Sequence, residues 1–220
     1  MAKRSGRLKS YAVKEAYYTL QGEGAQTGRA AVFLRFAGCN LWSGLERDRE
    51  KAVCQFCDTD FVGTNGEGGG KFKTALDVAE HVQSIWQAHA AGGRPYVICT
   101  GGEPLLQLNE ALITVFHEIG FEVGVETNGT IKAPTGIDWI CVSPKANATM
   151  LQTSGNEIKL VYPQPLAMPD RFEEMEFENF FLQPMDGPEG AQNVEATADY
   201  CMKNPKWRLS LQTHKLIGLP

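Results

Sequence analysis

Three cysteines, Cys39, Cys54 and Cys57, have a spacing that could hold a metal ion or a metal cluster. Fourteen residues separate the first pair and two separate the second. A Cys-x-x-Cys pair lets two thiolates reach one centre, and the third thiolate arrives across a charged loop, residues 43–51. The spacing alone leaves three interpretations open: a structural zinc site with a fourth ligand from elsewhere, an iron–sulfur cluster, or unligated thiols. The other cysteines are expected to be core thiols: Cys99, Cys141 and Cys201.

A second motif whose residues could take part in chemistry is Thr100-Gly-Gly-Glu-Pro104. Two glycines at the end of a strand would let the backbone approach a ligand closely, and a turn fixed by Pro104 would hold the Glu103 carboxylate. Such a carboxylate suits an ammonium group. The alternative interpretation is a tight turn with an exposed glutamate.

Short apolar and β-branched runs indicate the strands that would position these residues. Several of these runs are typical of strands buried on both faces. The expected strands are residues 31–36, 96–100, 122–126, 139–143, 157–162, 179–183 and 207–212. Polar groups follow six of them, at residues 39–40, 100–103, 126–128, 143–145, 183–186 and 212–214. Because the carboxyl ends of parallel strands share one face, these groups predict a single site there.

Three helices are expected between the strands, at residues 74–89, 109–119 and 193–203. The first starts at Thr74 with a capping box that uses Asp77 in place of glutamate, and Gly120 ends the second. Strands that alternate with helices favour parallel β/α units. Too few helices are present for eight full repeats, so we predict an α/β fold, an incomplete TIM-like β/α barrel with its active site at the carboxyl ends of the strands.

The length and composition exclude several classes of protein. A chain of 220 residues with 43% hydrophobic and 21% charged residues is typical of a folded protein, and we expect one domain over residues 1–220. Its loops would be an expanded cysteine loop, residues 40–53, and a glycine-rich loop, residues 63–70, that is a mobile connection or a lid. The net charge of −5 provides no overall positive electrostatic field that would attract a nucleic-acid backbone.

The sequence also bears on the compartment. No run approaches about 18 apolar residues, and no apolar run follows the basic residues 1–7 to make a signal peptide. We therefore expect no membrane association and a cytoplasmic location, where thiols stay reduced.

With both motifs in one chain, the sequence resembles the radical S-adenosylmethionine (SAM) superfamily. Members of that superfamily keep three cysteines after the first strand and a Gly-Gly-Glu-Pro motif after the second, usually with three and then two residues between the cysteines. The wider gap here departs from that spacing and narrows the resemblance to the 7-carboxy-7-deazaguanine synthase family. Four further motifs occur in the family's order: residues 18–24 (YTLQGEG), 126–129 (ETNG), 143–145 (SPK) and 183–186 (QPMD). The resemblance covers residues 11–220, nearly the whole chain.

The resemblance implies that Cys39, Cys54 and Cys57 bind a [4Fe–4S] cluster and leave one iron open for the amino and carboxylate groups of SAM. Through that open position the iron can pass one electron to SAM and break its C–S bond. Phe56 would pack near the adenine, and Gly102 and Glu103 would meet the methionyl amine. The ribose and carboxylate of SAM would contact Ser143, Pro144, Lys145, Gln183, Pro184, Met185 and Asp186.

The activity implied by the resemblance is a lyase reaction in queuosine-type 7-deazapurine biosynthesis. A 5′-deoxyadenosyl radical would take hydrogen from C6 of 6-carboxy-5,6,7,8-tetrahydropterin, and ring contraction with loss of ammonia would give 7-carboxy-7-deazaguanine and regenerate SAM. An unpaired Arg35 would be expensive to bury in its apolar strand, so it suits the substrate carboxylate; the alternative is an outward-pointing arginine. The implied substrate-binding residues are Leu20, Gln21, Gly22, Glu23, Arg35, Thr100, His214 and Pro220 with its terminal carboxylate.

The resemblance also implies a magnesium ion and protein partners. Thr59 matches the family's Mg²⁺ ligand, and Asp58 and Asp60 flank it. An electron donor such as flavodoxin and a homodimeric state are expected. Two other functions stay open from the residues: a glycyl-radical activating enzyme that acts on a protein, and a zinc-stabilised binding module without turnover.

Overall fold

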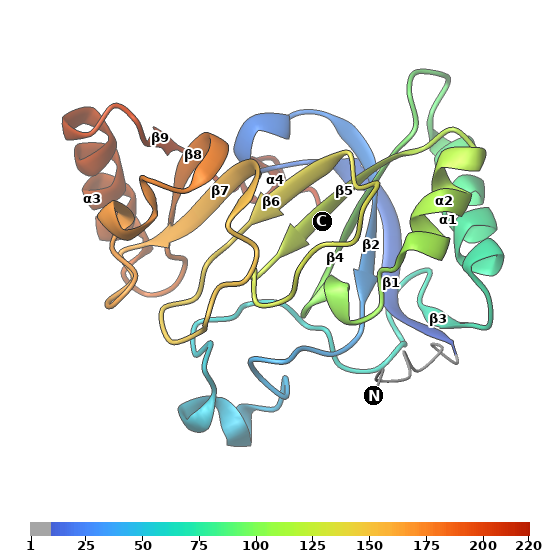
Figure 1. The fold of residues 1–220 in the computed structure, drawn as a ribbon, viewed down its shortest axis with the longest axis horizontal. Coiled ribbons are helices and arrows are strands. Elements are labelled where there is room, and N and C mark those ends of the chain that lie inside the picture. Colours follow the sequence, from blue (N-terminus) through green and yellow to red (C-terminus); the bar gives the residue numbers. More distant parts are fainter. Residues whose placement is uncertain (1–9) are drawn as a thin grey trace, which may run out of the picture.

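One mixed sheet organises the computed structural model, which describes residues 10–220 (Figure 1). Its order is β3-β1-β2-β4-β5-β6-β7-β8-β9, with β3 and β9 at the two edges of the described part. From β2 onward neighbouring strands are parallel, whereas β1 is antiparallel to both β2 and β3. The strands are β1 (Tyr11–Leu20), β2 (Ala30–Phe36), β3 (Gly70–Phe72), β4 (Tyr96–Gly101), β5 (Glu122–Thr127), β6 (Trp139–Val142), β7 (Ser154–Tyr162), β8 (Glu176–Pro184) and β9 (Arg208–Leu209). The open, mainly parallel sheet confirms the predicted incomplete barrel; the basic residues 1–7 lie outside the described residues.

The helices connect the strands much as the sequence predicts. The α-helices are α1 (Ala75–His89), α2 (Glu110–Glu118), α3 (Gly190–Lys203) and α4 (Thr213–Ile217), and the 3₁₀ helices are η1 (Gly24–Gln26), η2 (Glu46–Lys51), η3 (Pro104–Leu106) and η4 (Pro169–Phe172). The expected capping box is present, because the Asp77 amide donates to the Thr74 hydroxyl and the Thr74 amide donates to the Asp77 carboxylate. None of the helices in the described range is long and apolar enough to cross a membrane.

Two apolar clusters hold the helices on the sheet. Helices α1 and α2 lie side by side and cover β1, β2, β4 and β5 (Figure 1), where Leu34, Val97 and Phe116 are fully buried. At the other end of the sheet, α3 packs against β8 and β9 near Leu182 and Trp207, which are also buried. Burial of apolar area on this scale is the main favourable contribution to folding. It keeps the carboxyl ends of the strands in fixed relative positions.

Strand β1 was not expected from the sequence. The register with β2 shifts between Val13 and Glu15, and this irregularity breaks the alternation of apolar and polar side chains by which a strand is normally predicted. Lys14 is consequently buried, with 7% of its surface exposed. Its ammonium lies 2.7 Å from the Asp60 carboxylate and donates to the Val62 carbonyl at 3.0 Å.

The glycine-rich segment 63–70 packs closely against β1. The Gly66 amide donates to the Lys14 carbonyl at 2.9 Å, and the Ala16 amide donates to the Glu67 carbonyl at 2.8 Å. A Cβ atom at Gly69 would lie 2.2 Å from the Lys14 carbonyl oxygen, so glycine is needed for this approach. The segment leads directly into β3, and it is a packed extension of the sheet edge in this structure.

The end of the chain differs from the expected strand 207–212. Only Arg208 and Leu209 pair with β8. The chain then turns away, and the Thr213 amide donates to the Gly22 carbonyl at 2.9 Å. The Thr19 hydroxyl donates to a Pro220 oxygen at 3.2 Å. The tail, residues 213–220, therefore runs from the β9 edge to the end of β1.

Candidate active site

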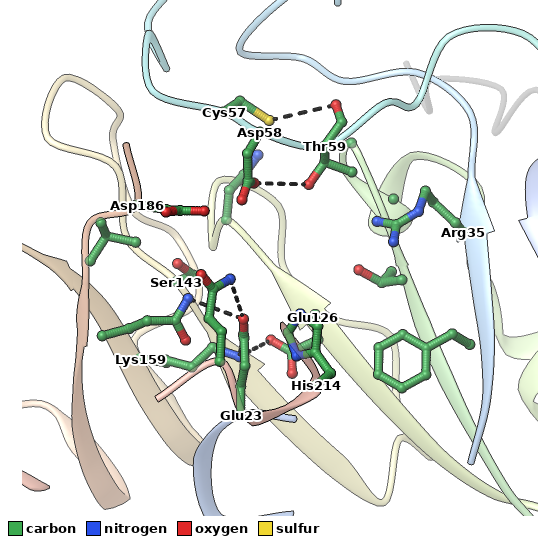
Figure 2. A pocket seen from close by; sticks show the side chains of 18 of the residues that line it. Glu23, Arg35, Cys57, Asp58, Thr59, Glu126, Ser143, Lys159, Asp186 and His214 are labelled. Atoms are coloured by element: carbon green, nitrogen blue, oxygen red, sulfur yellow. Dashed lines mark hydrogen bonds and ion pairs between the residues drawn. The ribbon is translucent and has the colours of Figure 1, made fainter. Parts of the chain in front are cut away.

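A cavity of about 420 Å³ lies along the inner face of the sheet and opens at the carboxyl ends of the parallel strands (Figure 2). Its walls combine residues from the cysteine loop, the strand ends and the tail. The residues predicted from sequence that line it are Leu20, Gln21, Glu23, Arg35, Cys54, Phe56, Cys57, Thr59, Thr100, Gly102, Ser143, Lys145, Gln183, Pro184, Met185, Asp186, His214 and Pro220. The sequence thus identified the contributing segments, because polar side chains at parallel strand ends necessarily converge.

The cysteine loop brings its thiols to the upper wall of this cavity. Cys54 and Cys57 line the cavity, whereas Cys39 lies beside them at the end of β2 and accepts a hydrogen bond from the Leu41 amide at 3.4 Å. All three are free thiols. A hydrogen bond from the Cys54 thiol, opposed by burial, lowers the pKa of Cys57 to about 6. Two soft sulfur donors in the cavity wall and a third beside them fit a cluster held by three thiolates.

The glycines of the Thr100–Pro104 motif allow β4 to press on the segment that leads to Cys39. Gly101 has a φ of +137°, and a Cβ atom there would lie 2.2 Å from the Phe36 carbonyl oxygen. A Cβ atom at Gly102 would lie 2.4 Å from the Gly38 carbonyl oxygen and 2.7 Å from the Cys39 Cβ. These contacts explain the two glycines by the close approach of two backbones.

Glu103 is fully buried and does not form the exposed turn considered as an alternative. One carboxylate oxygen accepts from the Leu105 amide at 2.9 Å and from the Thr127 hydroxyl at 2.8 Å, and the other accepts from the Asn128 amide at 2.9 Å. Burial raises the pKa of Glu103, while these hydrogen bonds oppose the shift. Glu103 is absent from the cavity wall, but Thr127 and Asn128, which it orders, line it.

A buried ion-pair group, Glu23, Glu126 and Lys159, forms one side of the cavity (Figure 2). The Lys159 ammonium lies 2.7 Å from Glu23 and 2.9 Å from Glu126. Burial opposes ionisation of Glu23, but the Lys159 charge and hydrogen bonds lower its pKa to about 2. Glu126 belongs to the strand-end group 126–128 that the sequence predicts at the site, whereas Lys159 is not among the predicted residues. A usable signal exists on β7, where Glu157 and Lys159 alternate with Ile158 and Leu160 and so share one face.

Three amide side chains are oriented by these carboxylates. Gln21 donates to Glu126 at 3.0 Å, and Gln183 and Gln212 donate to the same Glu23 oxygen at 3.1 and 2.9 Å. The side-chain oxygen of Gln183, Oε1, is buried and has no hydrogen-bond partner within the described residues. A buried acceptor without a partner at a cavity wall indicates a place for a donor group of a ligand.

Arg35 lies across the cavity from the ion-pair group (Figure 2). Its Nε donates to Glu15 at 2.7 Å and its Nη2 donates to the Tyr17 hydroxyl at 3.2 Å, with Glu15 paired opposite Arg35 in the sheet. The side chain is 17% exposed and lines the cavity, so it faces inward. The guanidinium is thereby oriented, which favours bidentate binding of a carboxylate.

The tail and the cysteine loop meet at the mouth of the cavity. The Lys215 ammonium lies 3.1 Å from Asp58 and 2.6 Å from Asp186. The Thr59 hydroxyl lies 3.5 Å from Asp58. Burial lowers the pKa of His214, so its imidazole is neutral at neutral pH. These contacts join three segments that are far apart in the sequence.

Four predicted residues are absent from the cavity wall. Cys39 lies beside the two cysteines of the wall, and Glu103 is buried against Thr127 and Asn128. The Pro144 carbonyl accepts from the Gln164 side chain at 3.3 Å, and a Cβ atom at Gly22 would lie 2.0 Å from Nδ1 of His214. Glu126 and Gln212 line the wall as members of the predicted strand-end groups 126–128 and 212–214. Wall residues not predicted from the sequence include Glu15, Tyr17, Phe33, Lys159, Val161 and Lys215.

Comparison with known proteins places this chain in a family. No family model matches the chain. Curated sequences do match. The 7-carboxy-7-deazaguanine synthase of Caulobacter vibrioides is 61% identical over 213 residues, which cover 96% of this chain and 100% of that protein. The chain belongs to the 7-carboxy-7-deazaguanine synthase family.

Other members of the family are similarly close. The enzymes of Bradyrhizobium diazoefficiens and Bordetella pertussis are each 59% identical, over 96% of this chain and 99% and 100% of their own lengths. The crystal structure of QueE from Escherichia coli aligns with a TM-score of 0.66 and 24% identity, over 92% of this chain and 93% of that one, and so supports the fold. Membership confirms the resemblance to radical SAM lyases that the motifs indicated, and with it a [4Fe–4S] cluster and SAM as the family's cofactors.

Proposed function

We propose that this chain converts 6-carboxy-5,6,7,8-tetrahydropterin into 7-carboxy-7-deazaguanine with loss of ammonia. The observation that supports this most is a single cavity that joins the cysteine turn to a guanidinium at one end and a carboxylate-rich group at the other. Arg35 lies at the first end, oriented by its ion pair with Glu15, while at the other end Glu23 and Glu126 outnumber the single charge of Lys159. A pterin that carries a carboxylate on one side and N–H groups on the other matches both ends.

Cys39, Cys54 and Cys57 would hold the [4Fe–4S] cluster. When bound, the cluster and SAM supply one-electron chemistry that the side chains alone cannot provide. Lys145 carries a point charge for the SAM carboxylate, and its ammonium lies 5.7 Å from the Phe56 ring, where the adenine would pack. Glu103 acts here by ordering Thr127 and Asn128. The proposed SAM-binding residues in the wall are Phe56, Gly102, Ser143, Lys145, Gln183, Pro184, Met185 and Asp186, and Glu103 and Pro144 would support this set from outside the wall.

The remaining wall residues would bind and orient the pterin. Arg35 would bind its carboxylate with two parallel hydrogen bonds. Gln21 and Glu23 are held in fixed orientations by Glu126 and Lys159, so they present hydrogen-bonding groups without reorganisation. His214, whose pKa is lowered by burial, could accept a proton or donate a hydrogen bond as a neutral imidazole. Leu20, Gly22, Thr100 and Pro220 complete the proposed substrate-binding set.

We also propose Thr59 as a ligand of Mg²⁺. Its hydroxyl lines the cavity, and a hydroxyl together with substrate oxygens and water suits a hard cation. The flanking carboxylates are already engaged, because Asp58 pairs with Lys215 and Asp60 pairs with Lys14. Equilibrium dialysis with Mg²⁺ and the pterin should show weaker uptake for Thr59→Val. Equal uptake by the parent and the variant would remove Thr59 from the site.

The partners proposed are an electron donor such as flavodoxin and a second copy of the chain. Exposed apolar side chains on α4 support the dimer, since Leu216 is 73% exposed and Ile217 is 61% exposed. Sedimentation of the parent and of Leu216→Glu tests it. A parent that sediments as a monomer would contradict the dimer.

Anaerobic purification tests the proposed reaction directly. The parent should be brown with about four irons per chain, and with SAM, reductant and the pterin it should form the deazapurine. Cys39→Ala, Cys54→Ala and Cys57→Ala should each abolish SAM cleavage, whereas Cys201→Ala on α3 should not. Colourless protein with one zinc would favour a binding module. Stoichiometric 5′-deoxyadenosine without a deazapurine would favour an activating enzyme.

A further inference from the structure

Arg49 lies on the inner side of the expanded cysteine loop, against the face of Trp42. Its guanidinium carbon is 4.1 Å from the centre of the Trp42 ring. The Trp42 ring is itself buried, packs edge-on against Phe61 with ring centres 5.6 Å apart, and donates to the Leu45 carbonyl at 3.3 Å. A cation on a buried aromatic face gains both electrostatic attraction and packing. Arg49 is therefore held in place by a rigid support.

The same guanidinium binds the turn between the second and third cysteines. Its Nη1 donates to the Gln55 carbonyl at 2.9 Å and to the Cys57 carbonyl at 3.0 Å. Its Nε donates to Glu46 at 2.8 Å. The Gln55 side chain adds a second link to η2, because it donates to the Glu50 carbonyl at 2.8 Å. The Cys54–Cys57 turn is thus bound to the helix of its own loop.

Nothing assigned so far explains why fourteen residues separate Cys39 from Cys54. A short linker would suffice to bring three thiols together. The long linker folds into η2, and η2 delivers Arg49 to the two carbonyls of the turn. The extra length is used for this contact.

We propose that Arg49 is a positioning residue for the Cys54–Cys57 turn and places a fixed positive charge beside the cluster. The inference rests on the proposed role of the three cysteines as cluster ligands. Groups that orient metal ligands control both retention of the metal and its redox potential. A nearby cation stabilises the reduced cluster, which carries one more negative charge, and so raises the reduction potential. Glu46, whose side chain is 76% exposed, accepts from Nε and Nη2 of Arg49, so the ion pair has its negative end toward solvent and its positive end toward the turn.

Arg47 provides a matched control from the same helix. Its side chain is 80% exposed, and its carboxylate neighbour, Asp48, lies 3.9 Å away. Arg47→Met therefore removes the same charge from the same helix without touching the turn. Arg49→Lys keeps the charge but cannot reproduce the planar contact with two carbonyls.

The test compares the reconstituted parent with Arg49→Met, Arg49→Lys and Arg47→Met. Iron release to a chelator and the midpoint potential from an anaerobic titration followed by electron paramagnetic resonance are measured. Arg49→Met should release iron about 10-fold faster or more and have a more negative potential. Arg49→Lys should release iron faster yet keep a potential near that of the parent. Arg47→Met should match the parent in both.

Several results would overturn the proposal. Iron release from Arg49→Met at the rate of Arg47→Met would show that the turn does not depend on Arg49, and an unchanged potential would show that its charge does not reach the cluster. A potential for Arg49→Lys equal to that of Arg49→Met would also contradict it. If Arg49→Met takes up too little iron for the titration, Arg49→Gln, which also lacks the positive charge, supplies the midpoint potential. A parent that binds no iron would instead refute the cluster assignment.

Discussion

The ammonium of Lys159 lies 2.7 Å from a carboxylate oxygen of Glu23, and only 5% of the lysine side chain is exposed. The same ammonium lies 2.9 Å from Glu126. Three elements, β7, the segment after β1 and the end of β5, are thereby fixed to one another at the cavity. Charges removed from water in this way stabilise a fold only as a complete set, because each needs its partner.

Replacement of Lys159 should therefore be costly. Lys159→Met leaves the partly buried Glu23 and Glu126 without their cation, and we expect a loss of about 3 kcal/mol in the free energy of unfolding. Anaerobic urea titration measures it. The control is Lys203→Met at the exposed end of α3, with an expected change within about 0.5 kcal/mol. A loss for Lys159→Met no larger than that of the control would contradict the argument.

Glu23 should give a distinct acid dependence of stability. Its pKa in the folded protein is about 2, below the ordinary value of 4.5, so the ionised form favours folding at pH values above 4.5. This contribution is lost as the pH falls from 4.5 towards 2. In Glu23→Gln the unfolding free energy should fall less steeply across that window. Parallel curves for the parent and the variant would show that Glu23 is not preferentially ionised in the folded state.

Gly22 and His214 should depend on each other sterically. A Cβ atom at Gly22 would lie 2.0 Å from Nδ1 of His214, so Gly22→Ala must displace the imidazole. We expect kcat/KM for the pterin to fall about 100-fold, as a displacement of about 1 Å can produce. Gly190→Ala is the control, since its Cβ would meet nothing closer than 3.9 Å. Normal turnover by Gly22→Ala would exclude a role for this arrangement.

Arg35→Lys should weaken substrate binding more than it affects SAM cleavage. The variant keeps a positive charge but loses the fork that Glu15 and Tyr17 orient. Loss of a charge-assisted hydrogen bond corresponds to about 1.5–3 kcal/mol in the binding free energy of the pterin. Anaerobic calorimetry with the pterin gives the affinity, and SAM cleavage without substrate gives the control. Unchanged affinity would remove Arg35 from the site.

The cysteine motif and the glycine motif could be predicted because each is local in the sequence. Cys54 and Cys57 belong to one turn, while Gly101 ends and Gly102 follows β4, a strand with a continuous apolar run. The parallel strands could be recognised for the same reason, since they are buried on both faces. Their carboxyl ends then had to share an edge.

Lys159, its pairing with Glu126, and β1 could not be predicted in the same way. The partners of Lys159 lie 33 and more residues away in the chain, so only the folded sheet brings the charges together. Within a β-rich run, a lysine next to isoleucine and leucine resembles the solvent-facing residue of an edge strand. The shifted register near Val13 hid β1, because a period of two cannot be detected across a bulge.

The open sheet does not close into a full barrel, and residues 213–220 run from its β9 edge to the end of β1, where they meet the Gly22 carbonyl and the Thr19 hydroxyl. A short terminal peptide therefore forms one side of the binding chamber, while the strands and the cysteine loop form the others. Exchange of that peptide would change the size of bicyclic compound that fits and would leave the cysteines and the strands in place.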